Sequence, residues 1–153
     1  MENSDIASMF HRIADILELQ GADVLRIRAY RNAALTIQDL PRRLEDMVRD
    51  DAEALKHLPS IGASMREKLE EILRTGTLSQ YEALRKSIPE GIFELLRLEG
   101  LGPKKVKVLH EQLKINTLHA LEEACRQNKL LKLRGMGQRR RKRTAADTVL
   151  RLL

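Results

Sequence analysis

The sequence contains no tryptophan, and aromatic residues make up only 3% of its 153 residues. Strands favour aromatic and β-branched residues, whereas the leucine, alanine, glutamate, lysine and arginine that dominate here favour helices, so the composition predicts an all-α protein. The single cysteine, Cys125, excludes an internal disulfide framework and fits a reducing compartment. No apolar run approaches the length of a membrane span, and the first residues lack the apolar core of a signal peptide. We therefore expect a cytoplasmic protein with no membrane partner.

Metal-binding patterns are also missing. The four histidines, at positions 11, 57, 110 and 119, have no mutual spacing typical of zinc ligands. No Asp-x-Asp pair is present to hold the two metal ions of a nucleotidyl-transfer site. We therefore expect no metal site built from side chains, no organic cofactor, and no nucleotide polymerisation by these residues.

Charge is distributed unevenly along the chain, whose formal net charge is +6. Residues 1–97 contain 14 basic and 17 acidic side chains, whereas residues 98–153 contain 14 basic and 5 acidic ones. Such a basic half favours a polyanion as partner. Residues 139–143 are five consecutive cations, of which Arg139 and Arg140 are the first two. This run favours a nucleic-acid contact over a merely solvated basic face.

Apolar residues recur along most of the chain at the three- and four-residue spacing of amphipathic helices. The predicted helices cover residues 4–19, 24–37, 42–48, a short segment ending at 58, 63–74, 77–87, 92–98, a segment beginning at 103, 117–125, and a last segment ending at 153. Pro89-Glu90-Gly91 combines the two strongest helix breakers, so we expect a hinge there. It divides the chain into a first module, residues 1–88, and a second module, residues 89–153.

A glycine-bracketed motif occurs three times. Its most complete copy is Gly100-Leu101-Gly102, and the others are Ser60-Ile61-Gly62 and Gly135-Met136-Gly137. We expect positive φ angles at Gly100 and Gly102, with Leu101 inserted between two helices. The last glycines of the three copies are separated by 40 and 35 residues. This regular repetition favours a repeated helix-to-helix turn over the alternative of a single short helical hairpin with solvated lysines.

The central motif continues into Pro103-Lys104-Lys105. Proline suits the first position of a helix, where the free backbone N–H groups attract anions. Lysines in a first turn are unfavourable for the helix dipole unless an anion lies between them and the dipole. Lys104 and Lys105 are therefore predicted to contact the phosphates of duplex DNA.

Nearly the whole chain resembles the N-terminal region of bacterial family X DNA polymerases, and its first module is similar to the small lyase domain of DNA polymerase beta. The resemblance is carried by the segments Arg28-Ala29-Tyr30-Arg31-Asn32-Ala33-Ala34, Leu58-Pro59-Ser60-Ile61-Gly62, Glu67-Lys68-Leu69-Glu70, Thr75-Gly76-Thr77-Leu78 and Gly100-Leu101-Gly102-Pro103-Lys104-Lys105. It implies tandem helix-hairpin-helix modules, one in the first module and two in the second. Such modules grip DNA phosphates through backbone amides, here at Gly62, Gly100, Gly102, Gly135 and Gly137. It also implies Na⁺ or K⁺ at hairpin carbonyls near Leu98 and Leu101.

The resemblance also implies a chemistry. Lys68 falls at the family's Schiff-base lysine, which in its neutral form attacks the C1′ aldehyde of an abasic 5′-deoxyribose phosphate. Arg26 and Lys56 match phosphate-binding positions, and Tyr30 matches a tyrosine that lines the pocket. Arg26 and Tyr30 are four residues apart, so spacing alone places them on one helical face. Arg31 is expected to contact phosphate as well, although a surface ion pair is the alternative.

Two departures from the family pattern affect the hairpins. Ser60 stands where the family has its first hairpin glycine, and Arg66 and Arg141 stand where it usually has a small residue. The first and third hairpins are therefore expected to be splayed or to bind weakly, and Arg66 is expected either to block the pocket or to support Lys68.

Three functions fit the sequence. The first is a nucleoid-associated DNA-binding protein of repair that grips gapped or nicked DNA without reading its sequence. The second adds abasic-site lyase activity at Lys68. The third is a non-catalytic adaptor that recruits a separate repair polymerase or nuclease.

Overall fold

The computed structural model describes residues 1–127, so the predictions for Gly135, Gly137, Arg139 and Arg140, and for the last helix, lie outside the described residues. Internal contacts divide the chain into two compact units, Met1–Ser87 and Ile88–Leu153. The sequence predicts a division one residue later.

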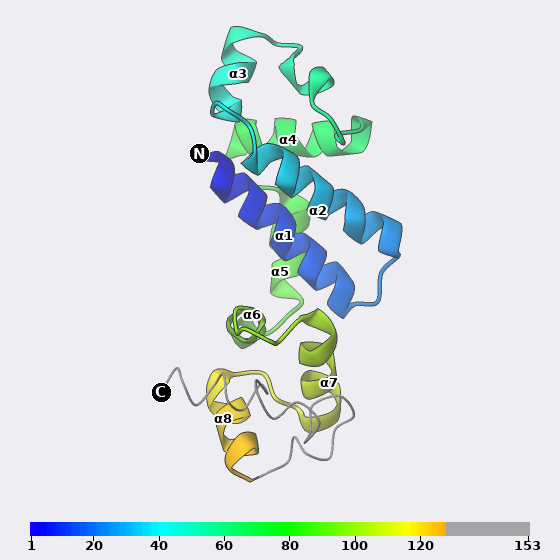
Figure 1. The fold of residues 1–153 in the computed structure, drawn as a ribbon, viewed down its shortest axis with the longest axis vertical. Coiled ribbons are helices and arrows are strands. Elements are labelled where there is room, and N and C mark those ends of the chain that lie inside the picture. Colours follow the sequence, from blue (N-terminus) through cyan, green and yellow to red (C-terminus); the bar gives the residue numbers. More distant parts are fainter. Residues whose placement is uncertain (128–153) are drawn as a thin grey trace. The chain divides into compact units, whose positions relative to one another are not determined.

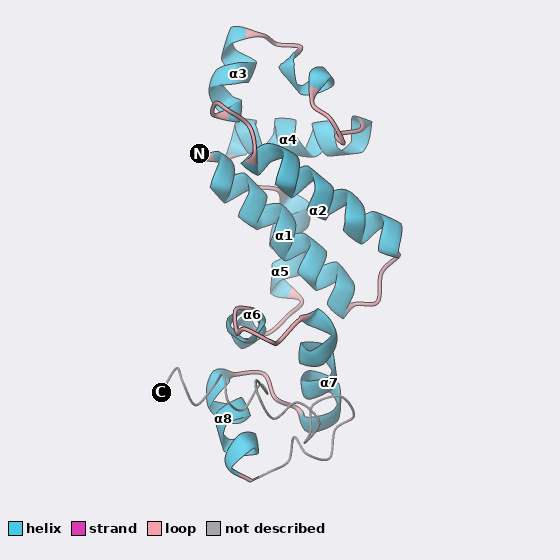
Figure 2. Ribbon diagram, viewed as in Figure 1, coloured by secondary structure: helices cyan, strands magenta, loops and turns pink. Residues whose placement is uncertain are grey.

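Every regular element in the described part of the chain is helical, which confirms the predicted all-α fold (Figure 2). The elements are α1 (Asn3–Leu19), α2 (Val24–Gln38), α3 (Leu44–Asp50), the 3-10 helix η1 (Ala54–His57), α4 (Ala63–Thr75), α5 (Ser79–Lys86), α6 (Glu90–Leu96), α7 (Pro103–Leu113) and α8 (Leu118–Arg126). Among residues 1–127, no helix combines the length and apolar character needed to cross a bilayer.

Unit 1 is built around α1 and α2, which lie side by side and run in opposite directions (Figure 1). The buried apolar residues of α1 and α2 face one another in a continuous core that also includes α4 and α5. The rings of Phe10 and Tyr30 meet edge to face, with centroids 5.8 Å apart and planes at 72°. This aromatic contact favours one rotation of α2 against α1, and that rotation sets which α2 residues remain on the surface.

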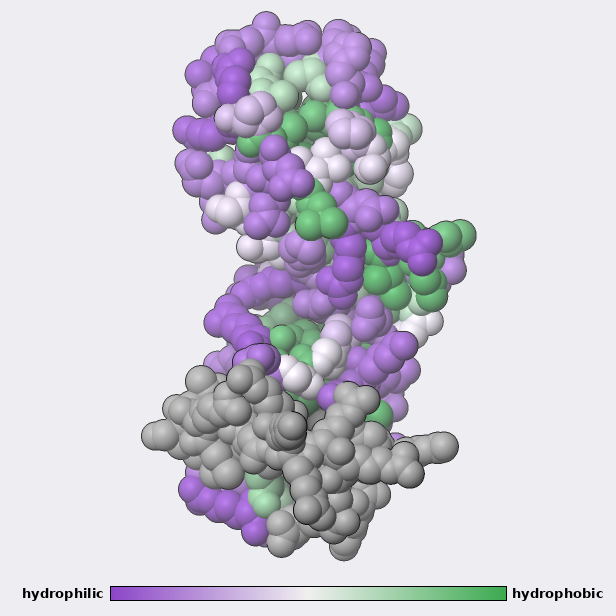
Figure 3. All heavy atoms as spheres, in the orientation of Figure 1, coloured by the Kyte–Doolittle hydropathy of each residue, from purple (hydrophilic) through white to green (hydrophobic). Residues whose placement is uncertain are grey.

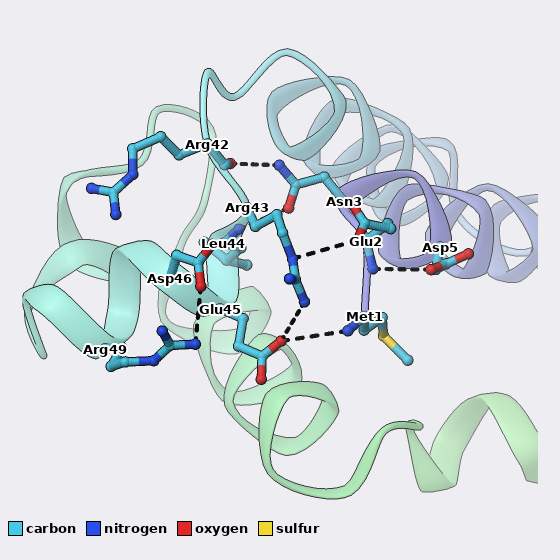
Figure 4. A network of polar contacts seen from close by, with 10 residues as sticks. All are labelled: Met1, Glu2, Asn3, Asp5, Arg42, Arg43, Leu44, Glu45, Asp46 and Arg49. Atoms are coloured by element: carbon cyan, nitrogen blue, oxygen red, sulfur yellow. Dashed lines mark hydrogen bonds and ion pairs between the residues drawn. The ribbon is translucent and has the colours of Figure 1, made fainter.

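A polar network fixes α3 against the start of α1 (Figure 4). The Asn3 side chain donates to the Arg42 carbonyl at 2.7 Å and accepts from the Leu44 amide at 2.8 Å. Arg43 pairs with Glu45 at 2.9 Å. The two hydrogen bonds of the Asn3 side chain satisfy backbone groups at the start of α3, which begins two residues later than the sequence predicts.

In unit 2, α6, α7 and α8 pack around Leu95, Val106, Leu109 and Leu121, all fully buried. Glu90 and Gly91 of the predicted hinge lie in the first turn of α6. A Cβ atom on Gly91 would come within 2.0 Å of the Asn116 carbonyl oxygen. The glycine therefore permits close packing of α6 against the segment before α8.

Candidate nucleic-acid interface

A pocket of about 520 Å³ opens on unit 1 between α2, α4 and the Ser60–Gly62 hairpin. Arg26 and Tyr30 reach it from α2, Lys68 from α4, and Gln80 from α5. Arg26 and Lys68 are the two basic residues of the lining, and no carboxylate lines the pocket. An anion is the ligand that this charge distribution favours.

Lys68 contacts two other residues of this lining. Its Nζ atom donates a hydrogen bond to Ser64 Oγ, one helical turn earlier, at 2.9 Å. The same Nζ lies 5.9 Å from the centroid of the Tyr30 ring, within the range of a cation–π contact. Lys68 is half-buried, so its ammonium is held in place yet remains accessible from the pocket.

Tyr30 is nearly fully buried, at 2% exposure, and its hydroxyl donates to Gln80 Oε1 at 3.2 Å. Burial raises the pKa of the Tyr30 phenol above its ordinary value, and the hydrogen bond with Gln80 and the nearby Arg26 charge only partly offset this effect. Tyr30 is therefore a neutral hydrogen-bond donor at physiological pH. Its ring forms part of the wall against which Lys68 rests.

Sequence reasoning missed two polar residues of the pocket lining. Ser64 precedes Lys68 by four positions, a spacing that could have indicated the contact. Gln80 lies in the first turn of α5, and its sequence neighbours carry no signal that would have singled it out. It reaches the pocket only because the Thr75–Thr77 turn, which includes Gly76 in the left-handed conformation, redirects the chain.

The structure does not bring two other predicted residues into the pocket. Arg31 points to α1, where it pairs with Asp15 at 2.8 Å and Glu18 at 3.7 Å. Lys56 lies in η1 and pairs with Glu53 at 2.5 Å. Arg66 is not part of the pocket lining either, so it does not block the space in front of Lys68.

The two described hairpins share one backbone conformation. Ser60 and Gly100 have positive φ angles of 62° and 87°, and the next residues, Ile61 and Leu101, are buried. Positive φ was also expected at Gly102, and this expectation is wrong: φ is −87° there, as it is −86° at Gly62. Both of these glycines are extended and serve as N-caps, of α7 and α4.

Each hairpin presents its N-capping glycine to open space. A Cβ atom on Gly62 or Gly102 would meet nothing within 4 Å. The first helical bonds run from the Arg66 and Val106 amides back to these glycines, so the amides before them have no partner within their helix. Another backbone or a phosphate can approach both helix starts closely.

Beside the second hairpin, Pro103 begins α7 as predicted and Lys104 is exposed. Lys105 Nζ donates to the Gly100 carbonyl at 3.1 Å, which places this ammonium over the hairpin. The Leu98 carbonyl accepts the Leu101 amide at 3.1 Å. A carbonyl oxygen has a second lone pair, which can bind a cation. A monovalent cation at the Leu98 and Leu101 carbonyls stays a prediction. No cluster of three metal-ligating side chains occurs within residues 1–127.

Both described hairpins have a buried central residue and an accessible helix start. These features define a class of domains that bind phosphates, and comparison with known families supports the same class. Residues 1–78 match the helix-hairpin-helix domain family, and residues 92–143 match the family described as a SAM-like helix-hairpin-helix tandem. The first match covers half of the chain. The chain belongs to the helix-hairpin-helix domain family.

Similarity to characterised proteins points to family X polymerases. The chain is 34% identical to the DNA polymerase/3′-5′ exonuclease PolX of Bacillus subtilis over 91% of its own length and 24% of that protein. It is 32% identical to DNA polymerase lambda of Arabidopsis thaliana over 72% of its own length and 20% of that protein. The chain thus spans about a quarter or less of the length of these relatives. The similarity confirms the predicted resemblance to the N-terminal region of family X polymerases.

Proposed function

We propose that this chain is a DNA-binding protein of repair that grips gapped or nicked DNA through its phosphates and does not read base sequence. The pocket in unit 1 is the observation on which the proposal rests, because two cations and a neutral phenol converge there beside a hairpin. A 5′-phosphate at a gap supplies the anion that fits this lining. The hairpins supply further phosphate contacts, and backbone contacts of this kind position a protein without identifying bases. Association with the nucleoid follows from such binding.

We further propose that Lys68 is the nucleophile of a 5′-deoxyribose-phosphate lyase. Lys68 first gives a proton to water, and its neutral amine adds to the C1′ aldehyde. The carbinolamine hydroxyl then takes a proton from water and leaves as water, which gives an iminium ion. A proton then leaves C2′ to water, the C3′–O bond breaks, and the departing phosphate oxygen takes the electron pair. Hydrolysis of the imine releases the sugar product and restores Lys68. The hydrogen bond to Ser64 and the Tyr30 ring support this role because they hold Nζ inside the pocket.

Borohydride trapping tests the lyase role on a one-nucleotide gap that carries a 5′-deoxyribose phosphate. The wild-type chain is expected to form a covalent adduct, whereas Lys68→Ala forms none even at concentrations at which it binds the gap. Lys86→Ala is the matched control, because Lys86 is an exposed lysine of α5 outside the pocket. If the gap is bound and no wild-type adduct forms, the lyase role is wrong and DNA binding stands.

The adaptor function has one observation in its favour. Val24 and Leu25, at the start of α2, are 63% and 69% exposed. Figure 3 shows apolar surface over this end of α2. Exposed apolar patches are typical of contacts with protein partners, so a separate polymerase or nuclease is the partner of this second candidate. Retention on heparin separates the candidates: weak retention despite the basic second half favours the adaptor.

A further inference from the structure

A second pocket, of about 360 Å³, adjoins the Lys68 pocket. It lies between the C-terminal half of α2 and the first hairpin, and Asn32, Leu35, Asp39 and Pro59 contribute to its lining. Ser60 lines both pockets. The Thr36 hydroxyl donates to the Pro59 carbonyl at 3.2 Å, which ties the hairpin to α2 at this point.

The two pockets differ in charge. The Lys68 pocket contains two cations and no carboxylate, whereas the second pocket contains no cation and one carboxylate, that of Asp39. A phosphate group is therefore attracted to the Lys68 pocket and repelled by the second pocket. The second pocket instead combines apolar walls at Leu35 and Pro59 with the Asn32 amide and the Asp39 carboxylate, which suits a flat, uncharged ligand that carries an amino group.

Two features of this region are unusual for a purely structural surface. Leu35 is 53% exposed, although it lies on the helix that forms the core of unit 1. Ser60 has a φ angle of 62°, a conformation that a non-glycine residue adopts only at a cost. Local backbone strain of this kind is found most often at binding and catalytic sites.

From these observations we infer that the second pocket binds an unpaired base of the DNA strand whose 5′-phosphate occupies the Lys68 pocket. The inference rests on the proposed function. The α2 residues of the two pockets are offset by about seven positions, or roughly 10 Å along the helix, so one strand can reach both. Asn32 and Asp39 are complementary to bases with an exocyclic amino group, and adenine is therefore preferred to thymine.

Gapped duplexes provide the test. The downstream strand carries a 5′-phosphate, and its first, unpaired residue is adenine, thymine or a tetrahydrofuran abasic analogue. We expect the wild-type chain to bind the adenine duplex about fivefold more tightly than the abasic one, with thymine between them. Leu35→Ala is expected to remove most of this advantage, and Asp39→Asn to remove the preference for adenine over thymine. Affinity for the abasic duplex stays unchanged in both variants.

Leu25→Ala is the matched control, since Leu25 is an exposed leucine of the same helix that lines neither pocket. Equal wild-type affinity for the adenine and abasic duplexes would overturn the inference and leave the phosphate pocket intact. Loss of affinity for all three duplexes in Leu35→Ala would also overturn it, because the leucine would then support the fold rather than a base. Failure of the wild-type chain to bind any gapped duplex would overturn the proposed function together with the inference.

Discussion

Ser60 and Gly100 occupy the same position in two hairpins and have the same left-handed backbone, with φ angles of 62° and 87°. A serine incurs a steric cost in this conformation that a glycine does not. Ser60 nevertheless keeps this conformation, so we expect the serine to affect the stability of the hairpin. Exchanging the two residue types should shift the stability of the two hairpins in opposite directions.

We expect Ser60→Gly to raise the free energy of unfolding by about 1 kcal/mol, and Gly100→Ser to lower it by about the same amount. Thermal or urea unfolding of each variant measures the change. Gly102→Ala is the control, because Gly102 has a negative φ and space for a Cβ atom, so its stability should stay within about 0.5 kcal/mol of wild type. A destabilised Ser60→Gly variant would contradict this account.

Arg26 and Arg31 are expected to differ in function although both lie on α2. Arg26→Ala should weaken binding to a 5′-phosphorylated gap about tenfold and leave stability unchanged, because one cation of the pocket is lost. Arg31→Ala should lower stability by less than about 1 kcal/mol, the range of partly exposed ion pairs, and barely affect binding. Fluorescence anisotropy and urea unfolding on the same samples measure both quantities.

The discriminating substrate is the same gap without its 5′-phosphate. On that DNA, Arg26→Ala and the wild-type chain should bind equally well. A phosphate-dependent loss in Arg31→Ala would show instead that Arg31 leaves its partners on α1 to contact DNA.

Helical phase explains part of what the sequence could predict here. Successive helix residues are about 100° apart, so Arg26 and Tyr30 share a face while Arg31 lies well away from it. That relation depends on sequence spacing alone, and it distinguishes the two arginines before any tertiary contact is considered. The helices themselves were predictable for the same reason, since apolar periodicity is a local property.

Other features depend on tertiary placement. Gln80 enters the pocket because a turn brings α5 back toward α2, and the second pocket requires α2 and the first hairpin together. The role of Gly91 required the position of the Asn116 carbonyl, 25 residues further along the chain. In each case the partner lies far away in the sequence, where periodicity carries no information.

The buried phenol of Tyr30 predicts a stability change at alkaline pH. The pKa of Tyr30 is 10.0 in the unfolded chain and is raised in the folded protein. At a pH between these two pKa values, the folded state binds one proton that the unfolded state has lost. The free energy of unfolding should therefore fall as pH rises above about 10, and this contribution is fully present below that pH. Urea unfolding at pH 8 to 11 measures the loss.

Tyr30→Phe removes the titrating group while keeping the ring, so its stability should fall less steeply over the same range. Tyr81→Phe keeps Tyr30 and should follow the wild-type chain. Parallel curves for Tyr30→Phe and the wild-type chain would show that other groups account for the alkaline loss.

Lys104 and Lys105 test the contribution of the second hairpin to DNA binding. Each phosphate contact by a lysine releases condensed counterions, and log affinity then falls with log salt concentration by about 0.9 per contact. Removing both lysines should flatten the slope by as much as about 2 on duplex DNA. Lys86→Ala combined with Lys114→Ala removes the same charge away from the hairpin and should flatten it less. An equal change in both double variants would mean that net charge, rather than the hairpin, attracts the DNA.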